Sequence, residues 1–480
     1  MTLLQEAPPA PSIPRARPSR VQTVLGNLMA TRIWQPRDLA NWYHLVRPLA
    51  RLARTSPGFA SPRMAYEMAT RIAFGYQPLP ATGRPPLGMD RPGPTRSVPD
   101  RPHVALFVDS PDHISGVATT LRQWAAAAEA GGYPLDIYHA GSAPMAAPSI
   151  CFEPVGTIGL AAYAGLTLQM PRVLEVQSTA DRCGFDVAHL STPGPMGLLG
   201  LILARDRGLP VVGTYPTDFP RYARDLTDDP AMAEVAWDAM RWFYGQMDRV
   251  AAPSSATRDD LIAHGLDPAR VAVVGRGIDT STFSPAHRRE ELRRAWHADR
   301  PHKILYVGRV SEEKNLSCLT KAFRMLAAAR RDVALTVVGD GPYLRTMRAD
   351  LEGLPVTFTG FLACRELAEA YASADLFAFP SETDTFGVVL LEAQASGLPV
   401  VVSGQGGPRD CVADGMSGRI LDPMTPGSLA RAIDAILSAP ATHAAMREAA
   451  EAHATRFTPE ASFQAFWGLH REFPQHLITS

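Results

Sequence analysis

The feature that most constrains this sequence is a rhythm of short, uninterrupted apolar runs separated by helix-like segments, and this rhythm occurs twice. Runs of Val, Ile, Leu and Ala without polar alternation are typical of parallel strands that are buried on both faces. Strands that alternate with helices fold into doubly wound sheets. The runs lie at 103–108, 186–190, 210–215, 249–253 and 271–275, and then at 303–308, 334–339, 356–360, 376–380 and 399–403.

The two series predict an α/β protein with two Rossmann-like domains that face a cleft. The join lies near residues 276–300, so we place the first domain at 101–285 and the second at 286–455. We expect residues 456–480 to form a C-terminal helix that returns to the first domain. Ligands of open α/β sheets bind outside the carboxyl ends of the strands, so the loops directly after the strands are where chemistry is expected.

Residues 1–100 differ in composition from the rest of the chain. They contain 13 Arg, no Lys and 5 acidic residues, which gives 13 − 5 = +8, and they hold 16 of the 43 prolines. Because the whole chain carries a net charge of −1, the remainder carries −9. We expect a Pro- and Arg-rich extension and linker, mostly helical or disordered. Its Arg-interleaved apolar segment at 21–75 either rests on an anionic membrane surface or packs on the core.

Bulk composition excludes several classes of protein. A nearly neutral chain does not have the basic charge of a nucleic-acid binder. The 5 cysteines have no CxxC spacing, so we expect free thiols in a reducing cytoplasm and neither a zinc site nor a disulfide framework. The N-terminus has no basic region followed by an apolar one, so no signal peptide is expected.

The segment 380–401 is the strongest candidate for a site. A polar loop follows the strand and leads into a helix that ends near Ala395. Asp384 lies at the helix entrance, where a carboxylate suits the helix dipole, and Glu392 follows 8 residues later. On a helix this spacing separates the two carboxylates by about 12 Å, so they address two ends of an elongated ligand and cannot share one metal. The alternative is a capping Asp and a solvated Glu.

Backbone groups of the same segment are further candidates. The N–H groups of Phe386 and Gly387 lie at a helix N-terminus and suit an oxyanion or a hydroxyl. Glycine also lets the backbone approach a ligand closely. In the first domain, Gly116 precedes a helix predicted from about 117 to 130 and offers the same kind of contact; the alternative is a helix cap.

The loop at 307–315 contributes two cations. Arg309 and Lys314 follow the first strand of the second domain and suit a pyrophosphate, Arg as a bidentate fork and Lys as a point charge. The chain has only three Lys among its 47 basic residues, so a lysine at this position is informative. The alternative is a solvated loop in which Lys314 pairs with Glu312 and Glu313.

Five motifs occur in order at the expected strand ends and resemble those of glycosyltransferase family 4, which are retaining enzymes of the GT-B fold. They are ISGVATTL, GRGID, VGRVSEEKN, VVGDGP and SETDTFGVVLLEA. The resemblance covers about residues 101–475. The sequence around SETDTFG is similar to that of the branch containing lipid-directed sulfoquinovosyl-, digalactosyl- and mannosyltransferases.

The resemblance implies a role for each matched residue. Asp384 would contact the transferred sugar, Glu392 would hold the donor ribose, and Arg309 and Lys314 would bind the donor diphosphate. The remaining donor-side candidates are Phe386, Gly387, Ser381 and Gly116. Two cations at the diphosphate make a metal unnecessary, and no carboxylate cluster suggests one, so neither a metal nor another cofactor is expected.

One position departs from the family pattern. The segment GTYPTDFP at 213–220 has Pro216 where many relatives have a His that borders the reacting sugar. The remaining candidates on the acceptor side are Asp218, Tyr215 and His189. His189 lies within a predicted strand, where a histidine is more often a hydrogen-bonded core residue.

The sequence therefore predicts a retaining glycosyltransferase that moves a hexose from a UDP- or GDP-sugar to a lipid or glycan acceptor. We expect it in the cytoplasm, with peripheral association at the inner membrane face and no nucleic-acid partner. Two alternatives remain. One is a catalytically impaired GT-B subunit that binds nucleotides or glycans, suggested by Pro216. The other is a sugar-nucleotide epimerase, for which no set of cleft acid and base residues can be assembled.

Overall fold

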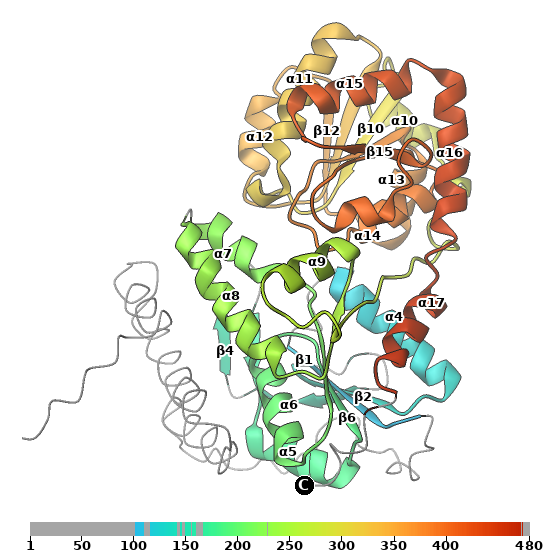
Figure 1. Ribbon diagram of the computed structural model, residues 1–480. Coiled ribbons are helices and arrows are strands. Elements are labelled where there is room, and N and C mark those ends of the chain that lie inside the picture. The colour runs from blue at the N-terminus through green and yellow to red at the C-terminus, as the bar shows by residue number, and fades with distance from the viewer. Residues whose placement is uncertain are drawn as a thin grey trace, which may run out of the picture.

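The computed structural model describes most of the chain after residue 100 (Figure 1). The described residues are 101–109, 116–141, 145, 149–154, 156–159, 167–227, 229–471 and 473. The extension expected at 1–100, with its apolar segment at 21–75, lies outside the described residues.

The N-terminal domain is built on a sheet of seven strands in the order β3-β2-β1-β6-β7-β8-β9. Every pair of neighbours is parallel. The inner strand β1 (Val104–Val108) is buried along its whole length, as expected of a strand covered on both faces. The other strands are β2 (Leu135–Ala140), β3 (Ser149–Phe152), β6 (Val187–Leu190), β7 (Val211–Thr214), β8 (Arg249–Ala252) and β9 (Val271–Val273).

The C-terminal domain repeats this plan with six parallel strands in the order β12-β11-β10-β13-β14-β15. The strands are β10 (His302–Val307), β11 (Val333–Val338), β12 (Val356–Gly360), β13 (Leu376–Phe379), β14 (Val400–Ser403) and β15 (Gly418–Leu421). A short antiparallel pair, β4 (Gly156–Gly159) and β5 (Thr167–Met170), stands apart from both sheets.

Helices cover both sheets (Figure 1). Those of the N-terminal domain are α4 (Gly116–Gly131), α5 (Val173–Cys183), α6 (Pro195–Asp206), α7 (Phe219–Thr227), α8 (Pro230–Gly245) and α9 (Ser255–Ala263). The later helices are α10 (Glu290–Ala295), α11 (Leu316–Ala329), α12 (Leu344–Asp350), α13 (Cys364–Ala372), α14 (Val388–Ala395), α15 (Pro426–Leu437), α16 (Pro440–Ala454) and α17 (Pro459–Gly468). Three 3-10 turns are η1 (Pro285–His287), η2 (Glu312–Lys314) and η3 (Gly407–Cys411).

The two-sheet architecture predicted from the apolar runs is confirmed. All ten runs form strands, and the helix expected at 117–130 is α4. The sequence did not reveal β2, β3, β15 or the β4–β5 pair. Strand β2 contains Asp136 and His139, which interrupt its apolar pattern, and the other missed strands are only four residues long.

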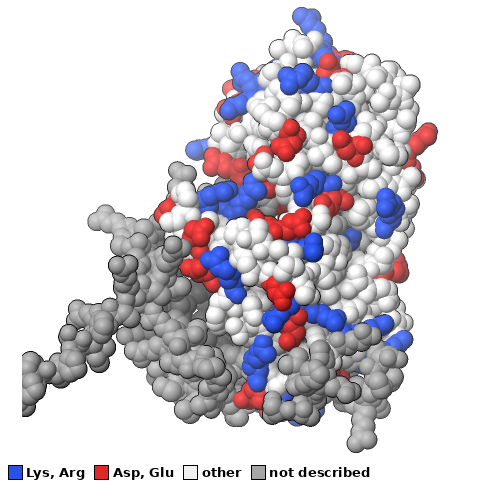
Figure 2. Space-filling view, in the orientation of Figure 1, with Lys and Arg blue, Asp and Glu red and all other residues white. Residues whose placement is uncertain are grey.

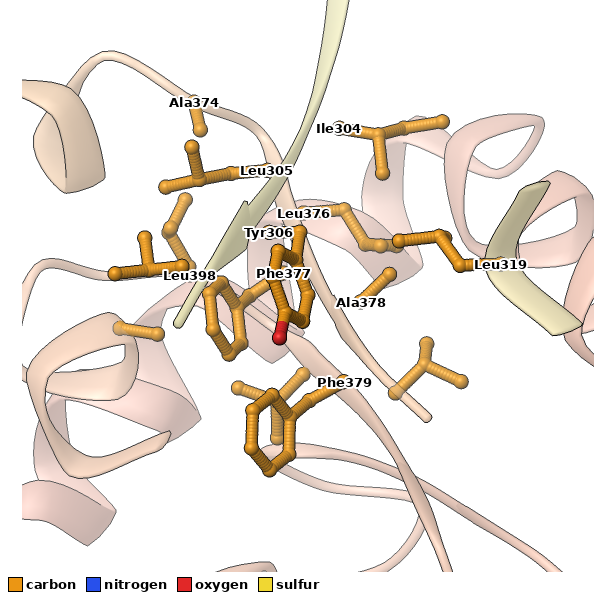
Figure 3. Packing of buried hydrophobic residues seen from close by; sticks show 14 of the residues in the cluster. Ile304, Leu305, Tyr306, Leu319, Ala374, Leu376, Phe377, Ala378, Phe379 and Leu398 are labelled. Atoms are coloured by element: carbon orange, nitrogen blue, oxygen red, sulfur yellow. The ribbon is translucent and has the colours of Figure 1, made fainter. Parts of the chain in front are cut away.

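The core of the C-terminal domain lies around β10 and β13, which pair in parallel at the centre of its sheet. Figure 3 shows their side chains packed together, with the rings of Tyr306, Phe377 and Phe379 close to one another. The Tyr306 and Phe379 rings stack with their centroids 6.1 Å apart. This packing provides a rigid base for the two loops that follow β10 and β13.

The end of the chain returns to the N-terminal domain. Helix α17 lies beside α4 in Figure 1 and packs against it. The rings of Phe466 and Trp124 stack with their centroids 4.1 Å apart, and the Trp124 indole N–H donates to the Ser462 hydroxyl at 3.1 Å. This helix therefore completes the hydrophobic core on one face of the N-terminal sheet.

Two segments connect the domains, and they touch one another. The N–H of Ile278, after β9, donates to the carbonyl of Phe457 at 2.8 Å, just before α17. A Cβ on Gly277 would lie 2.5 Å from the Pro459 backbone, so only glycine fits this approach. We call Gly277–Ile278 and 457–459 the two linkers.

Two general expectations are also addressed by the structure. All five cysteines are free thiols, as predicted: Cys151, Cys183, Cys318, Cys364 and Cys411. Among the described residues, no helix has the length and apolar character needed to cross a bilayer.

The contact between the linkers generates a prediction about stability. In Gly277→Ala the new methyl meets backbone atoms of Pro459 and Thr458, which cannot rotate away, so the linkers must separate. We expect a loss of about 1–3 kcal/mol in the free energy of unfolding, typical of overpacking, measured by chemical denaturation. Gly245→Ala is the matched control, because a Cβ there meets nothing within 4 Å and alanine favours a helix. Equal stability of the two variants would contradict this account of the linkers.

Candidate functional site

The candidate site is built from loops at the carboxyl edges of both sheets. In the C-terminal domain, the parallel pairing of β10 with β13 brings the segments after Val307 and Phe379 to the same edge. The sequence placed Arg309 and Lys314 on the first of these loops and Ser381 and Asp384 on the second. The structure brings the two loops together.

An ion pair joins the two loops. The Lys314 ammonium lies 2.9 Å from both carboxylate oxygens of Asp384. Lys314 is buried, and about a quarter of the Asp384 side chain is exposed (24%). A second bond between the loops runs from the Thr383 hydroxyl to the Glu313 carbonyl at 3.1 Å. The residues expected at the sugar and at the diphosphate are thus direct neighbours.

The alternative for Lys314, a pairing with its sequence neighbours, is not what the structure shows. Among the described ion pairs, Lys314 pairs with Asp384 and not with Glu312 or Glu313. The Glu313 carboxylate instead accepts from the Ser311 hydroxyl at 2.6 Å. Arg309 lies one residue past Gly308, and the Tyr306 hydroxyl donates to its carbonyl at 2.9 Å, which fixes the backbone of the loop.

The start of α14 is a helix N-terminus that no side chain caps within the described part of the chain. Gly387 precedes the helix with a φ of 104°, a left-handed conformation that glycine adopts without strain. The Asp384 carbonyl accepts from the N–H of Gly407 at 2.9 Å, which holds the loop in place. Phe386 and Ser381 are buried, so the two residues shape the loop from within the protein.

Glu392 has a partner that the sequence did not reveal. Its carboxylate accepts from the buried Tyr371 hydroxyl, on α13, at 2.8 Å. Burial raises the pKa of Glu392 to about 7, and the hydrogen bond from Tyr371 acts in the opposite direction. No ion pair compensates this carboxylate in the described residues, so near neutral pH it exchanges readily between its two protonation states.

The separation predicted for the two carboxylates rested on a continuous helix and needs correction. Helix α14 begins at Val388, so Glu392 is helical and Asp384 lies on the preceding loop. The rise of about 12 Å therefore does not describe their spacing. Asp384 instead faces Lys314, and Glu392 faces Tyr371, so the two carboxylates have separate surroundings.

In the N-terminal domain, Gly116 is the first residue of α4 and meets two other parts of the cleft. A Cβ at this position would lie 3.0 Å from Nη1 of Arg276 and 3.3 Å from Cγ2 of Val388. Val388 is the first residue of α14, so the N-termini of α4 and α14 converge on the Arg276 guanidinium. Sequence reasoning missed Arg276, although it lies within the GRGID motif at 275–279.

Burial lowers the pKa of Arg276 to about 10, and the nearby Asp384 carboxylate opposes this effect. Arg276 also lines a cavity between α4 and the ends of the central strands, where it is the only charged side chain among the described lining residues. The remaining lining residues are Leu106, Val117, Thr120, Leu121, Trp124, Ser191, Thr214, Pro216, Ala251, Pro253 and Val274.

The residues predicted on the acceptor side have different surroundings. Asp218 is partly exposed and accepts from the N–H of Arg221 at 3.1 Å; burial raises its pKa. Tyr215 is buried beside Trp237 and Tyr244, and its hydroxyl meets no hydrogen-bonding group in the described structure.

His189 belongs to the core, which is the alternative that the sequence favoured for a histidine within a strand. Its ring is fully buried, with Nδ1 2.8 Å from Nε2 of His470 and Nε2 2.7 Å from the Thr214 hydroxyl. Burial holds its pKa well below the usual range, so the ring is neutral. The central strand β6 that carries it is covered on both faces, and this burial keeps His189 away from a ligand.

The domains meet across the cleft through loop backbone groups. The Thr385 hydroxyl donates to the Pro216 carbonyl at 2.9 Å, and the Thr257 hydroxyl donates to the Thr385 carbonyl at 3.2 Å. Arg221 donates to the Glu382 carbonyl at 2.5 Å. The position that departs from the family pattern, Pro216, is therefore part of the contact between the domains.

A second buried carboxylate, Asp109, follows β1 and serves the structure. It accepts from the Thr192 hydroxyl at 2.5 Å and from the N–H of Met196 at 2.6 Å, at the start of α6. Burial raises its pKa to about 6. A Cβ on Gly194 would meet this carboxylate at 2.4 Å. The loop at 191–197 thus folds around Asp109.

Charge on the visible face is mixed. Figure 2 shows Lys and Arg interspersed with Asp and Glu over both domains, without a field of a single sign. Within the described ranges, no three side chains of His, Cys, Asp and Glu gather as a metal site.

Comparison with known proteins tests the resemblance. A model described as Glycosyltransferase Family 4 matches residues 114–282, and one described as Glycosyl transferases group 1 matches residues 288–453. A GDP-mannose-dependent alpha-mannosyltransferase of Mycobacterium tuberculosis is 40% identical over 278 residues, which cover 57% of this chain and 68% of the relative. The chain belongs to glycosyltransferase family 4.

A further relative agrees with this membership, and a solved structure shares the fold. The sulfoquinovosyl transferase SQD2 of Arabidopsis thaliana is 35% identical over 247 residues, which cover 51% of this chain and 48% of that protein. The structure of Anabaena Alr3699/HepE in complex with UDP-glucose superposes with a TM-score of 0.60 over 77% of this chain and 100% of that one, at 20% identity. The GT-B fold expected of a family 4 member is thereby confirmed, and the chain is a transferase that acts on nucleotide sugars.

The surroundings of Glu392 generate a prediction about pH. If this carboxylate accepts hydrogen bonds from the donor, binding requires its ionised form. Because its folded pKa is raised to about 7, affinity for a nucleotide sugar should increase as the pH rises from 6 to 8. Tyr371→Phe removes the hydrogen bond that stabilises the ionised form, so the midpoint should move to higher pH. Both profiles are measured by calorimetric titration with a nucleotide sugar, whose phosphates do not titrate in this range.

Glu392→Gln provides the control for this profile, since its side chain cannot ionise and affinity should become low and independent of pH. The same variant removes a buried carboxylate that is ionised above about pH 7. It should therefore unfold at a higher temperature than the native protein at pH 8. Loss of thermal stability in Glu392→Gln would instead assign this residue a structural role.

Proposed function

We propose that this protein is a retaining hexosyltransferase that moves a hexose from a nucleoside-diphosphate sugar to a hydroxyl of a lipid or glycan acceptor. The observation that carries the proposal is the Lys314–Asp384 ion pair at 2.9 Å, which lies beside the uncapped start of α14. A cation, a carboxylate and backbone N–H groups thus face the place where a sugar diphosphate is expected.

Each group has a role in holding the donor. Lys314 and Arg309 neutralise the diphosphate, and Asp384 accepts hydrogen bonds from hydroxyls of the transferred sugar. Backbone groups at Phe386 and Gly387 approach the same sugar. Glu392, with its ionisation supported by Tyr371, accepts hydrogen bonds from the ribose hydroxyls.

The reaction then requires no protein nucleophile. The bond from the anomeric carbon to the diphosphate oxygen breaks, and negative charge develops on the leaving phosphate beside Lys314 and Arg309. Preorganised cations stabilise this charge. The acceptor hydroxyl forms the new bond on the same face of the sugar, and its proton passes to the leaving phosphate oxygen. Because side-chain cations neutralise the leaving group, the proposed reaction needs neither a metal nor another cofactor.

The relatives narrow the substrates to be tried first. The mycobacterial relative is named for GDP-mannose, and a relative in Streptococcus pneumoniae, 29% identical, is named alpha-monoglucosyldiacylglycerol synthase. GDP-mannose and the UDP-glucose bound in the Anabaena structure are therefore the first donors to test, with diacylglycerol among the acceptors. We propose a cytoplasmic protein at the membrane surface, with the segment 21–75, outside the described residues, as the part that contacts anionic lipid.

A first experiment measures donor binding and transfer. Purified protein is screened for thermal stabilisation by UDP- and GDP-sugars, and the stabilising donors are then assayed for hexose transfer. Lys314→Ala should weaken binding of the nucleoside diphosphate by about 10- to 100-fold, as expected for a lost charge-assisted hydrogen bond, and should leave nucleoside binding nearly unchanged. Lys321→Ala, which removes an exposed lysine of α11, is the matched control. Equal losses for nucleoside and nucleotide would contradict the diphosphate role.

A second candidate function rests on Pro216. A chain that keeps the donor site but lacks the family histidine could bind nucleotides or glycans without catalysing transfer. The contact at this position uses the Pro216 carbonyl, which every amino acid has, so a histidine can replace the proline without removing the bond from Thr385.

Pro216→His distinguishes the two functions. A gain of about tenfold or more in the transfer rate, at unchanged donor affinity, would identify a decayed catalyst. An unchanged or lower rate in the variant, with turnover in the native protein, would show that proline belongs to a working enzyme. Thr385→Val removes the bond to the Pro216 carbonyl and serves as the control for disturbed domain contacts.

A further inference from the structure

Arg276 is a largely buried cation of the N-terminal domain, and the fold does not explain why a charge lies there. It lies after β9, just before the Gly277–Ile278 linker, and its guanidinium reaches the point where α4 and α14 begin. A Cβ at position 116 would lie 3.0 Å from Nη1 of Arg276, so a glycine at this position makes room for the guanidinium.

The charge of Arg276 has no direct partner among the described residues. Within the described part of the chain it makes no hydrogen bond or ion pair, although it is largely buried. The nearby Asp384 carboxylate is already held at both oxygens by Lys314. Burial lowers the pKa of Arg276 to about 10, so the group remains charged at neutral pH, and the nearby Asp384 carboxylate offsets the cost of its desolvation only in part.

The surroundings of Arg276 favour an anion. The N-termini of two helices, α4 and α14, carry partial positive charge, and they converge on the guanidinium. The cavity that it lines is otherwise apolar apart from Thr120, Ser191 and Thr214. Weakly polar walls strengthen the attraction between a guanidinium and an anion.

We propose that Arg276 binds a non-bridging oxygen of the donor diphosphate from the N-terminal domain, opposite Lys314. This inference rests on the proposed function, because it requires the diphosphate to lie between Lys314 and the start of α14. Lys314 and Arg309 belong to the C-terminal domain, whereas Arg276 belongs to the N-terminal domain. The leaving phosphate is therefore held by both domains, and groups from each domain neutralise its developing charge.

The experiment compares ligand binding by Arg276→Gln, Arg276→Lys and the native full-length protein. The probes are GDP and guanosine, with UDP and uridine as a second pair. Arg276→Gln should weaken binding of the nucleoside diphosphate about tenfold or more, equal to about 1.4 kcal/mol, and should leave binding of the nucleoside unchanged. Arg276→Lys should recover part of the lost affinity, since an ammonium keeps the positive charge but cannot form the bidentate hydrogen bonds of a guanidinium.

Two further measurements separate this role from a structural one. Arg258→Gln, on the exposed face of α9, is the matched control and should behave like the native protein. Arg276→Gln should keep or gain thermal stability without ligand, because it removes a buried charge that lacks a partner. A loss of stability in both Arg276 variants, with native affinity for the nucleoside diphosphate, would overturn the proposal.

The same experiment distinguishes the source of the anion. If Arg276→Gln raises only the KM for a negatively charged acceptor and leaves the affinity for GDP and UDP unchanged, the guanidinium serves the acceptor and the proposal is wrong. Its failure is also distinct from failure of the proposed function. In that case Lys314→Ala would still lose its preference for the diphosphate, whereas a protein that binds no nucleotide at all would contradict both.

Discussion

Parallel pairing of β10 with β13 is the constraint on which the site depends. Parallel strands must end at the same edge of a sheet, so the loops after Val307 and Phe379 have no alternative to being neighbours. The packed rings of the C-terminal core fix both strands, and the Lys314–Asp384 ion pair then locks the loops to one another. Residues 70 positions apart in sequence thereby form one constellation.

The site contains both paired and unpaired charges, and the two kinds have different effects on the protein. Lys314 and Asp384 neutralise one another and order the loops in the absence of a ligand. Arg276 lies near the start of α14 and Glu392 lies within that helix; both are largely enclosed and form no ion pair among the described residues. Uncompensated buried charges lower the stability of a protein, and natural chains keep them mainly where function requires them. Both residues are therefore candidates for direct contact with a ligand.

Much of the fold followed from the sequence, because most of the buried parallel strands have an uninterrupted apolar pattern, and the rule about strand ends then places the loops. The pairing of Lys314 with Asp384 could not be derived in this way, since it depends on side-chain directions that no spacing encodes. Arg276 was overlooked because it lies in a linker motif and its importance comes from helices elsewhere in the chain. The core position of His189 could be expected from its strand, but its partner could not, since the sequence does not show that His470 returns to cover it.

The contact between the two linkers has a consequence for how substrates enter. Both covalent connections between the domains pass through one spot, where Ile278 is hydrogen-bonded to Phe457 and Gly277 lies against Pro459. Such a joint acts as a pivot: a small rotation there displaces nearby atoms little and distant atoms most. The mouth of the cleft therefore opens on the side away from the linkers. A bulky acceptor can enter there without any stretching of the chain, while Arg276, next to the pivot, stays close to its place throughout the movement.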